Sequence, residues 1–278
     1  MKPITHKTAV QIIEQKNTNS VPFLVLCDDA ELYYVKTMFK THPPFEDLIN
    51  EILCVYGLEL MNVKTIPPAL INIPQEVFED FKKENKPFDE RYNNLAFDDV
   101  LFFGSLLQES TTEVEVYNVS LKNKFDFNKY KNPTDLLKIG IFDYWIGNKD
   151  RRGSNPNILI KELSNGKFEF LPIDHTQAFG LQSNYKALRL DVMPAINSKS
   201  ILRTSMSKSI ISFADSKFMA NFHNEILADF ENVINNLDFV FNQIPNTFGL
   251  SKAGKKKIVE ILSNKKRNLL VSKIYHTI

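Results

Sequence analysis

Cysteine and glycine are scarce in this 278-residue chain, and neither sign of charge dominates. The two cysteines, Cys27 and Cys54, are too few for a disulfide framework or for a zinc site built from cysteines. Lys and Arg number 34 against 33 Asp and Glu, a net charge of +1. This balance predicts no general electrostatic attraction to nucleic acid or to a membrane surface. The composition therefore excludes a disulfide-stabilised miniprotein and makes direct nucleic-acid binding unexpected.

Long apolar runs are also missing from the sequence. No stretch approaches the roughly 18 apolar residues that a membrane-spanning helix needs, so no span is expected. Residues 1–7 lead into no apolar segment of the kind found in signal peptides. Together with the low cysteine count, this favours a cytoplasmic protein. Hydrophobic residues make up 43% of the chain, which is enough for a substantial core in one or two domains.

The first third of the chain carries short apolar runs separated by turn-forming residues, a pattern typical of strands. The first three runs are joined by tight connections, which predicts an antiparallel meander. Pro43 and Pro44 interrupt this pattern, and the apolar spacing then becomes helical over residues 45–60. A short exposed helix is expected within residues 75–94. The expected strands are residues 8–14, 21–26, 32–37, 69–73 and 100–107.

Helical spacing dominates the rest of the chain, with one hairpin among the helices. A helix is expected from Pro133 to Ile146, and Gly147 is placed to end it. Residues 157–161 and 167–171 flank a Ser-Asn-Gly sequence, which predicts a β-hairpin. The pattern therefore indicates an α+β fold with a strand-rich first third and a helix-rich last half.

The polar loop between that helix and the hairpin carries the candidate catalytic residues. Asp150 lies in the loop, Asn155 follows five residues later, and Asp174 comes just after the returning strand of the hairpin. Because a hairpin brings its two ends together, we expect Asn155 to lie beside Asp174. Phosphoryl transfer uses such a set: Asp150 accepts or orients the acceptor's hydroxyl proton, and the other two hold Mg²⁺ against the phosphates of ATP. The structural alternative is a polar turn stabilised by Asx side chains.

A lysine on the third expected strand suggests a phosphate site. Lys36 lies on that strand, and the helix that follows carries Glu46, Asp47 and Glu51. Kinases hold the α- and β-phosphates of ATP with a strand lysine that is paired to a helix carboxylate. Glu51 is the preferred partner and Asp47, one turn earlier, competes with it. The alternatives are a solvated lysine and an exposed carboxylate.

These segments resemble a known family. Gly147-Asn148-Lys149-Asp150-Arg151 with Asn155, followed by Ile173-Asp174, resembles the catalytic and metal-binding segments of the HipA-like kinases. The segments are more distantly similar to those of phosphoinositide 3- and 4-kinases. The resemblance implies that Asp150 is the catalytic aspartate, that Lys36 binds the phosphates of ATP, and that Glu51 pairs with Lys36. It also implies that Asn155 and Asp174 are the magnesium ligands.

The resemblance also implies the architecture. A bilobed protein-kinase-like α+β fold is expected, with an antiparallel-sheet small lobe over residues 1–108 and a mainly helical large lobe over residues 109–278. ATP should lie between the lobes, with its adenine near the strand at residues 100–107.

Three features depart from the family pattern. Arg152 stands where the family often has a histidine two residues after the catalytic aspartate, and His175-Thr176 follows Asp174 where protein kinases have Phe-Gly. There is no glycine-rich phosphate loop, because the first glycine is Gly57. The best candidate for that loop is the segment 17–20, where Ser20 and the backbone amides could bind phosphate.

The family resemblance implies transfer of the γ-phosphoryl group to a protein Ser or Thr, with residues of the enzyme itself as an alternative. Members are often toxin components in bacteria, so an antitoxin-like partner is implied. A lipid or small-molecule kinase would share every catalytic residue. A kinase-shaped binding module without turnover is a further alternative, favoured by the missing glycine-rich loop. The candidates for autophosphorylation are Ser198, Ser200, Thr204, Ser205 and Ser207.

Several residues near the motif are expected to be structural. Asp143 should bond the backbone of the catalytic loop, Asn148 could orient the same loop, and His175 should be a packing or hydrogen-bonding residue. Trp145 is expected in the core. Residues 252–273 hold eight basic residues and one acid, and we interpret them as the solvated face of an amphipathic helix, with an acidic partner or nucleic acid as the alternative.

Overall fold

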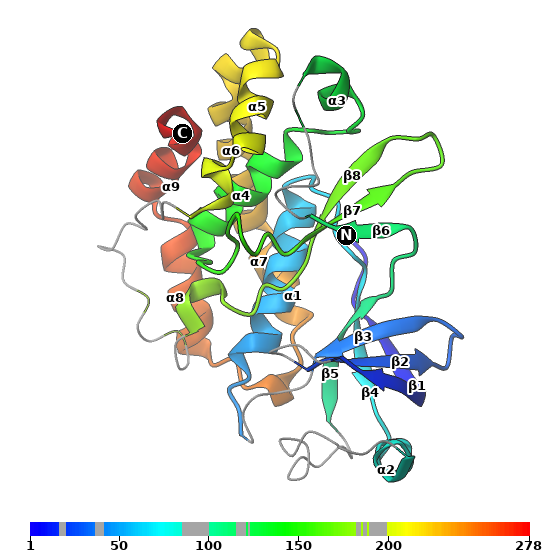
Figure 1. Ribbon diagram of the computed structural model, residues 1–278. Helices are drawn as coiled ribbons and strands as arrows, with labels where there is room; N and C mark the ends of the chain where they lie inside the picture. The colour runs from blue at the N-terminus through cyan, green and yellow to red at the C-terminus, as the bar shows by residue number, and fades with distance from the viewer. Residues whose placement is uncertain are drawn as a thin grey trace.

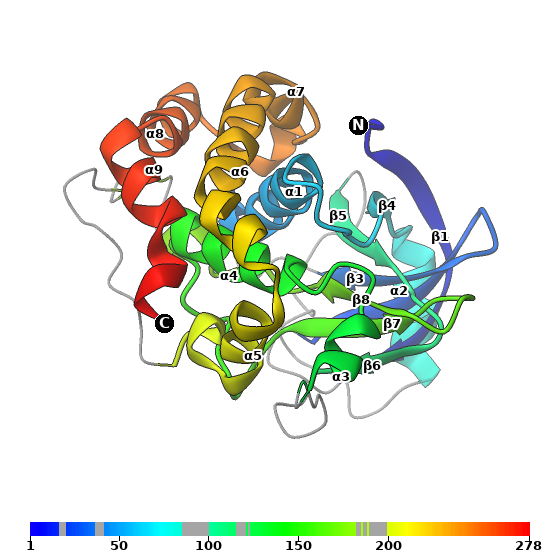
Figure 2. The same cartoon turned by 90° about the horizontal axis from the view of Figure 1, so that it is seen from above.

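The strands lie on one side of the molecule and most of the helices on the other in the computed structural model (Figure 1). The view from above shows the same division (Figure 2). A connected cluster of buried apolar side chains nevertheless runs through both sides, from Phe23 among the strands to Phe230 among the helices. The structure describes residues 1–16, 21–36, 42–84, 100–114, 121, 123–181, 185, 188 and 199–278.

Strands from the first third of the chain close into a barrel. They are β1 (Thr5–Gln15), β2 (Phe23–Cys27), β3 (Leu32–Lys36), β4 (Pro68–Asn72) and β5 (Leu101–Leu106). The predicted meander is confirmed, because β1 pairs antiparallel with β2, and β2 with β3. The barrel then continues in the order β3-β5-β4 and closes where β4 pairs in parallel with β1, with Thr5 opposite Ala69. This closure is not evident from the local sequence pattern.

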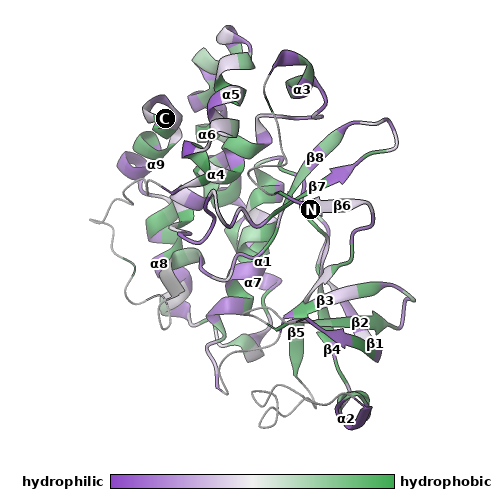
Figure 3. Ribbon diagram, in the orientation of Figure 1, coloured by the Kyte–Doolittle hydropathy of each residue, from purple (hydrophilic) through white to green (hydrophobic). Residues whose placement is uncertain are grey.

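Apolar side chains fill the barrel and extend to a helix outside it. Phe23 and Val25 of β2 and Phe102 of β5 are fully buried, and Figure 3 colours much of these strands as hydrophobic. The helix predicted within residues 75–94 is confirmed as α2 (Gln75–Glu84). It is not wholly exposed, because its Phe78 and Phe81 pack edge-on against Phe23.

Two buried helices form the centre of the helical side. They are α1 (Glu46–Leu60) and α4 (Asp135–Ile146), and nearly every residue of each is buried. Most of their residues are apolar, which suits a protein interior, but α1 also buries polar side chains, among them Asn50 and Glu51. The two approach closely because Gly57 of α1 lies against the ring of Phe142, where an added Cβ would stand 2.9 Å from the ring. As predicted, Gly147 ends α4 in the left-handed region, with φ of 74°.

The predicted hairpin is confirmed as β7 (Ile158–Glu162) and β8 (Phe168–Pro172). With β6 (Thr111–Glu113) it forms a second sheet in the order β6-β7-β8. In the hairpin register, Ile158 lies opposite Pro172. The ends of the hairpin therefore deliver the residues just before 158 and just after 172 to the same place.

Shorter and later helices surround α1 and α4. The prediction of one solvated face over residues 252–273 is wrong in part, because the segment forms two helices and its Arg267 is buried. Arg267 donates to the carbonyl of Trp145 at 2.5 Å, and Trp145 itself is in the core as predicted, stacked on Phe230. In the described parts of the chain, no helix has the length and apolar character to cross a bilayer. The remaining helices are α3 (Lys124–Asn128), α5 (Ser205–Phe213), α6 (Ser216–Asn235), α7 (Leu237–Asn242), α8 (Lys252–Leu262) and α9 (Lys265–Ser272), with 3₁₀ turns at Ala178–Leu181, Ile201–Arg203, Asn246–Phe248 and Ile274–Thr277.

Candidate active site

An ion pair joins the barrel to the central helix. Lys36 is the last residue of β3, and its Nζ lies 2.5 Å from Oε1 of Glu51 in the middle of α1. Burial opposes the charge of Lys36, but Glu51 and Asp174 outweigh it and raise the pKa of this lysine. Burial also raises the pKa of Glu51, although Lys36 acts in the opposite direction. The strand lysine and the helix carboxylate singled out in the sequence are thus in direct contact.

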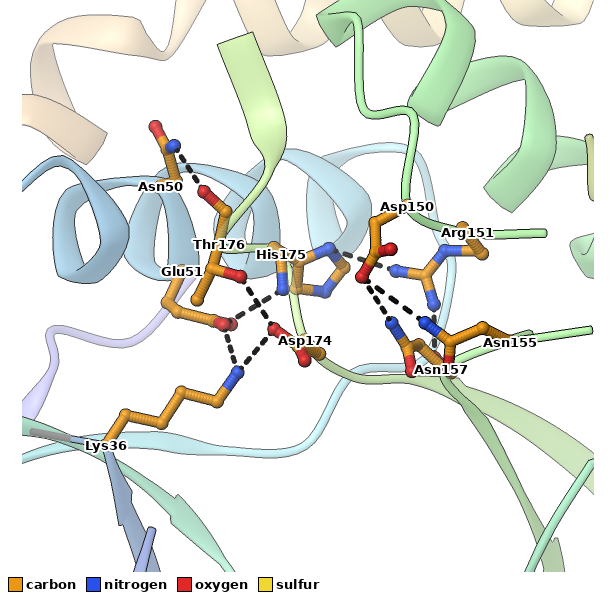
Figure 4. A network of polar contacts seen from close by, with 10 residues as sticks. All are labelled: Lys36, Asn50, Glu51, Asp150, Arg151, Asn155, Asn157, Asp174, His175 and Thr176. Carbon is orange, nitrogen blue, oxygen red and sulfur yellow. Dashed lines mark hydrogen bonds and ion pairs between the residues drawn. The ribbon is translucent and has the colours of Figure 1, made fainter. Parts of the chain in front are cut away.

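Asp174 completes a three-residue charged group around the lysine. Its Oδ1 accepts from Nζ of Lys36 at 2.8 Å and from the hydroxyl of Thr176 at 2.9 Å (Figure 4). Burial disfavours the carboxylate, but the charge and hydrogen bonds of Lys36 outweigh burial, so the pKa of Asp174 lies well below its usual range. Asp174 therefore stays ionised at neutral pH, as a metal ligand must be.

Asp174 and Asn157 flank the open end of the hairpin in the same unusual backbone conformation. Their φ angles are 57° and 47°, in the left-handed region that Asp and Asn tolerate better than other side chains. The backbone N of Ile173 donates to the carbonyl of Asn157 at 2.9 Å. This bond fixes Asn157 directly opposite the residue that precedes Asp174.

Asp150 lies in the loop after α4 and faces two asparagine amides. Its Oδ2 accepts from Nδ2 of Asn155 at 3.3 Å and from Nδ2 of Asn157 at 3.4 Å. The backbone N of Asp150 donates to Oδ1 of Asn148 at 3.1 Å. Asp150 is therefore held through both its backbone and its side chain.

Asn155 was expected beside Asp174, but its side chain donates to Asp150 instead. Asn155 is exposed in a tight turn, where its backbone bonds in both directions with Arg152. Ile158 pairs with Pro172, so the same register brings Asn157 opposite Ile173, one residue before Asp174, and leaves Asn155 two residues further out. Asn157 was not singled out from the sequence, although its place just before the first hairpin strand could have indicated it.

Asp143 and Asn148 hold the start of the loop, but the carboxylate of Asp143 bonds side chains there rather than the loop backbone that the sequence had suggested. Asp143 accepts from Nδ2 of Asn148 at 3.0 Å and from Nε of Arg151 at 2.7 Å. Burial raises the pKa of Asp143 to about 6, although Arg151 acts against that rise. The buried Asp143 thus accepts hydrogen bonds from one residue that precedes Asp150 in the sequence and from one that follows it.

Arg151 connects this loop with the segment that follows Asp174. Its Nη1 donates to the carbonyls of Pro156, at 3.0 Å, and of Asn157, and its Nη2 lies 3.2 Å from Nδ1 of His175. His175 is buried, as is Arg151, and burial holds the pKa of His175 well below its usual range. Sequence reasoning assigned no role to Arg151, although it is part of the motif quoted above.

The segment after Asp174 is also anchored to the central helix. Nδ2 of Asn50 donates to the carbonyls of Thr176 at 3.0 Å and Ala178 at 2.7 Å. The backbone N of His175 donates to Oε1 of Glu51 at 2.9 Å. The position of Asp174 is therefore set by α1 as well as by the hairpin.

The donor set fits a magnesium–nucleotide complex. Among the described residues, no group of three or more His, Cys, Asp and Glu side chains is arranged to hold a metal. One ionised carboxylate, together with an asparagine held opposite the residue that precedes it, is the kind of hard, sparse protein ligation that Mg²⁺ accepts when phosphates and water supply the rest. The expected phosphate contact at Ser20 lies outside the described residues.

Comparisons with known proteins agree with a kinase. A family model described as HipA-like kinase matches residues 9–274. Among solved structures, the Helicobacter pylori proinflammatory kinase CtkA superposes with a TM-score of 0.50 at 14% identity, covering 99% of this chain and 98% of that chain. The Golgi casein kinase with Mn/ADP bound gives a TM-score of 0.45 at 17% identity, covering 98% and 74%.

The first of these likenesses supports the fold alone, and the second is too distant to carry an argument. A search of curated proteins finds no match to this chain. The assignment of the family therefore depends on the family model, which spans nearly the whole sequence.

Proposed function

Because the chain belongs to the HipA-like kinase family, we propose that it transfers the γ-phosphoryl group of ATP to the hydroxyl of a protein Ser or Thr, with Mg²⁺ as the metal. The observation that carries the proposal is the contact of Lys36 with both Glu51 and Asp174. It joins a phosphate-binding cation, its orienting carboxylate and a candidate metal ligand in one group.

Lys36 is proposed to bind the α- and β-phosphates of the nucleotide. Glu51 is buried and holds the ammonium group from the α1 side, so that the lysine is oriented before the nucleotide arrives. A phosphate site needs a fixed cation, because positioning and electrostatic stabilisation supply most of the catalysis in phosphoryl transfer.

Asp174 is proposed to hold Mg²⁺ together with the amide oxygen of an asparagine. Asn155 is the ligand expected from the sequence. Asn157 is the stronger candidate, because its backbone is fixed opposite Ile173 and its side chain is less exposed than that of Asn155. When bound, Mg²⁺ neutralises charge on the phosphates of ATP.

Asp150 is proposed to accept the proton of the acceptor hydroxyl. The hydroxyl oxygen forms a bond to the γ-phosphorus, the bond from that phosphorus to the bridging oxygen of ADP breaks, and the hydroxyl proton moves to the carboxylate. The amides of Asn155 and Asn157 lie at Oδ2, which leaves Oδ1 for the hydroxyl. The products are a phosphoester and ADP.

We also propose that the expected division into lobes applies, with residues 1–108 as the ATP-binding lobe and residues 109–278 as the catalytic lobe. The barrel and Lys36 belong to the first range. One change to this division is supported: α1 packs against α6 and α7, so we assign this helix to the catalytic lobe. The adenine is proposed to lie near β5, which pairs with the strand that carries Lys36.

The acceptor can be identified by incubating the protein with γ-labelled ATP and Mg²⁺ together with three pools: Ser/Thr-containing proteins, vesicles containing phosphatidylinositol, and small metabolites. We expect label on protein Ser or Thr. Label confined to the lipid or to a metabolite would overturn the proposal of a protein kinase, but the protein would still be a phosphotransferase. Nucleotide binding that does not depend on Mg²⁺, with no transfer to any pool, would indicate a binding module instead.

A further inference from the structure

A buried arginine touches both loops that carry the proposed catalytic groups. The side chain of Arg151 has no measurable exposure. Its three nitrogens reach Asp143 at the end of α4, the carbonyls before β7, and His175 after Asp174. One rigid guanidinium therefore spans the catalytic loop and the metal-binding loop.

The contact with His175 fixes which ring nitrogen carries the proton. A guanidinium only donates hydrogen bonds, so Nδ1 of His175 must accept and the hydrogen must sit on Nε2. That Nε2 is buried and has no hydrogen-bond partner among the described residues. A buried donor without a partner costs free energy, so the ring depends on its contact with Arg151 and on an interaction with the backbone of Pro172.

The connection continues beyond His175 to the phosphate-binding pair. The backbone N of His175 donates to the same Oε1 of Glu51 that contacts Lys36. A chain of short polar contacts thus runs from Asp143 through Arg151, His175 and Glu51 to Lys36, and Figure 4 shows most of it in one view. Asp150 and Asp174 are each one residue away from a member of this chain.

We propose that Arg151 is a positioning residue that, through His175, holds Asp150 at its working separation from Asp174. The proposal depends on the function proposed above and adds a residue to it. Phosphoryl transfer needs the proton acceptor and the metal ligand in fixed relation, and a displacement of about 1 Å can cost about a hundredfold in rate. Arg151 contacts neither nucleotide nor acceptor in this scheme, so it should affect turnover more than binding.

Two pairs of variants separate positioning from general stability. Arg151→Lys keeps a positive charge beside Asp143 but loses the fork that reaches three partners at once. His175→Asn keeps an acceptor near the position of Nδ1, whereas His175→Phe keeps the ring shape and removes the acceptor. The control is Arg267→Lys, because Arg267 is another buried arginine that donates to a carbonyl, from α9.

We expect kcat to fall about a hundredfold in Arg151→Lys and in His175→Phe, while the KM for ATP and the affinity for Mg²⁺–ADP change less than about threefold. His175→Asn should recover most of the lost kcat, and Arg267→Lys should leave kcat unchanged. The double variant Arg151→Lys/His175→Phe should be little worse than either single one. Equal losses in both His175 variants, or losses of nucleotide affinity as large as those of kcat, would overturn the proposal.

Hydrogen exchange provides a readout that does not need turnover. In the wild type, binding of Mg²⁺–ADP should protect backbone amides of residues 173–176 and of residues 150–157 together. In Arg151→Lys only the first segment should gain protection, and protection of both would contradict the proposed coupling. A wild type that shows the joint protection but transfers no phosphate would count against the proposed function alone.

Discussion

Lys36 and Asp174 stand 138 positions apart in the sequence, and their side chains meet at 2.8 Å between Nζ and Oδ1. This contact joins the end of a barrel strand to the turn after a hairpin in the second sheet. Because Glu51 binds the same lysine, three charges from three different elements depend on one another.

Asp174→Asn should remove the magnesium dependence of nucleotide binding. The carboxylate stays ionised because Lys36 holds its pKa below the usual range, and a neutral amide is a poorer ligand for a divalent cation. We expect the affinity for ATP in the presence of Mg²⁺ to fall about 10- to 100-fold, measured by titration calorimetry with and without the metal. Unchanged affinity would mean that the metal binds elsewhere.

Asn157 should matter more than Asn155 for the metal. Glycine suits the left-handed backbone of Asn157, so Asn157→Gly and Asn155→Gly form a matched pair that removes only the side-chain amide. We expect Asn157→Gly to weaken Mg²⁺-dependent ATP binding about tenfold or more, and Asn155→Gly to weaken it less than about threefold. A larger loss of affinity in Asn155→Gly than in Asn157→Gly would indicate that Asn155 is the metal ligand.

Lys36→Met should destabilise the protein as well as abolish transfer. The side chain of Glu51 is 2% exposed, and removal of its partner leaves a buried charge, which costs about 3–5 kcal/mol. Adding Glu51→Gln removes that charge, so the double variant should regain stability to chemical denaturation while transfer stays absent. Recovery of activity in the double variant would show that Lys36 has no direct role at the phosphates.

Asp135 should make stability depend on pH. Burial raises the pKa of this residue, at the start of α4, to about 7, although Lys138 acts against that rise. Between about pH 4, where an unfolded Asp titrates, and about pH 7, the folded protein binds the extra proton, so this group lowers stability as the pH rises.

Asp135→Asn removes this dependence. The difference in unfolding free energy, variant minus wild type, should therefore grow from pH 4.5 to pH 8, by up to about 4 kcal/mol for a shift of about three pKa units. Denaturant titrations at the two pH values measure it. If the unfolding free energies of the two proteins change equally between the two pH values, the raised pKa of Asp135 is contradicted.

Local patterns in the sequence predict much of this fold. The alternation in residues 8–37 and the Ser-Asn-Gly turn at residues 164–166 gave the meander and the hairpin, because neighbouring strands joined by tight turns are specified by their own residues. The helix ending at Gly147 was equally clear, since its apolar face and its stop signal are both local.

Contacts between residues far apart in the sequence were harder to predict. The parallel pairing of Thr5 with Ala69 joins strands that are separated by the rest of the barrel, and nothing local marks it. Lys36, Glu51 and Asp174 could be placed together only through resemblance to a family. Arg151 was overlooked because a buried arginine has the same sequence signature as an exposed one. Asn157 was overlooked because the sequence pattern does not fix the hairpin's register closely enough to say which asparagine lies opposite Ile173.

Transfer from γ-labelled ATP to protein in the presence of Mg²⁺ tests the central claim most directly, with wild type and Asp150→Asn compared at equal nucleotide occupancy. We predict labelled Ser or Thr with the wild type, and at least about a hundredfold less with the variant, because the variant lacks the proton acceptor and keeps the binding groups. A wild type that binds Mg²⁺–ATP and labels no acceptor, or a variant as active as the wild type, would contradict the account.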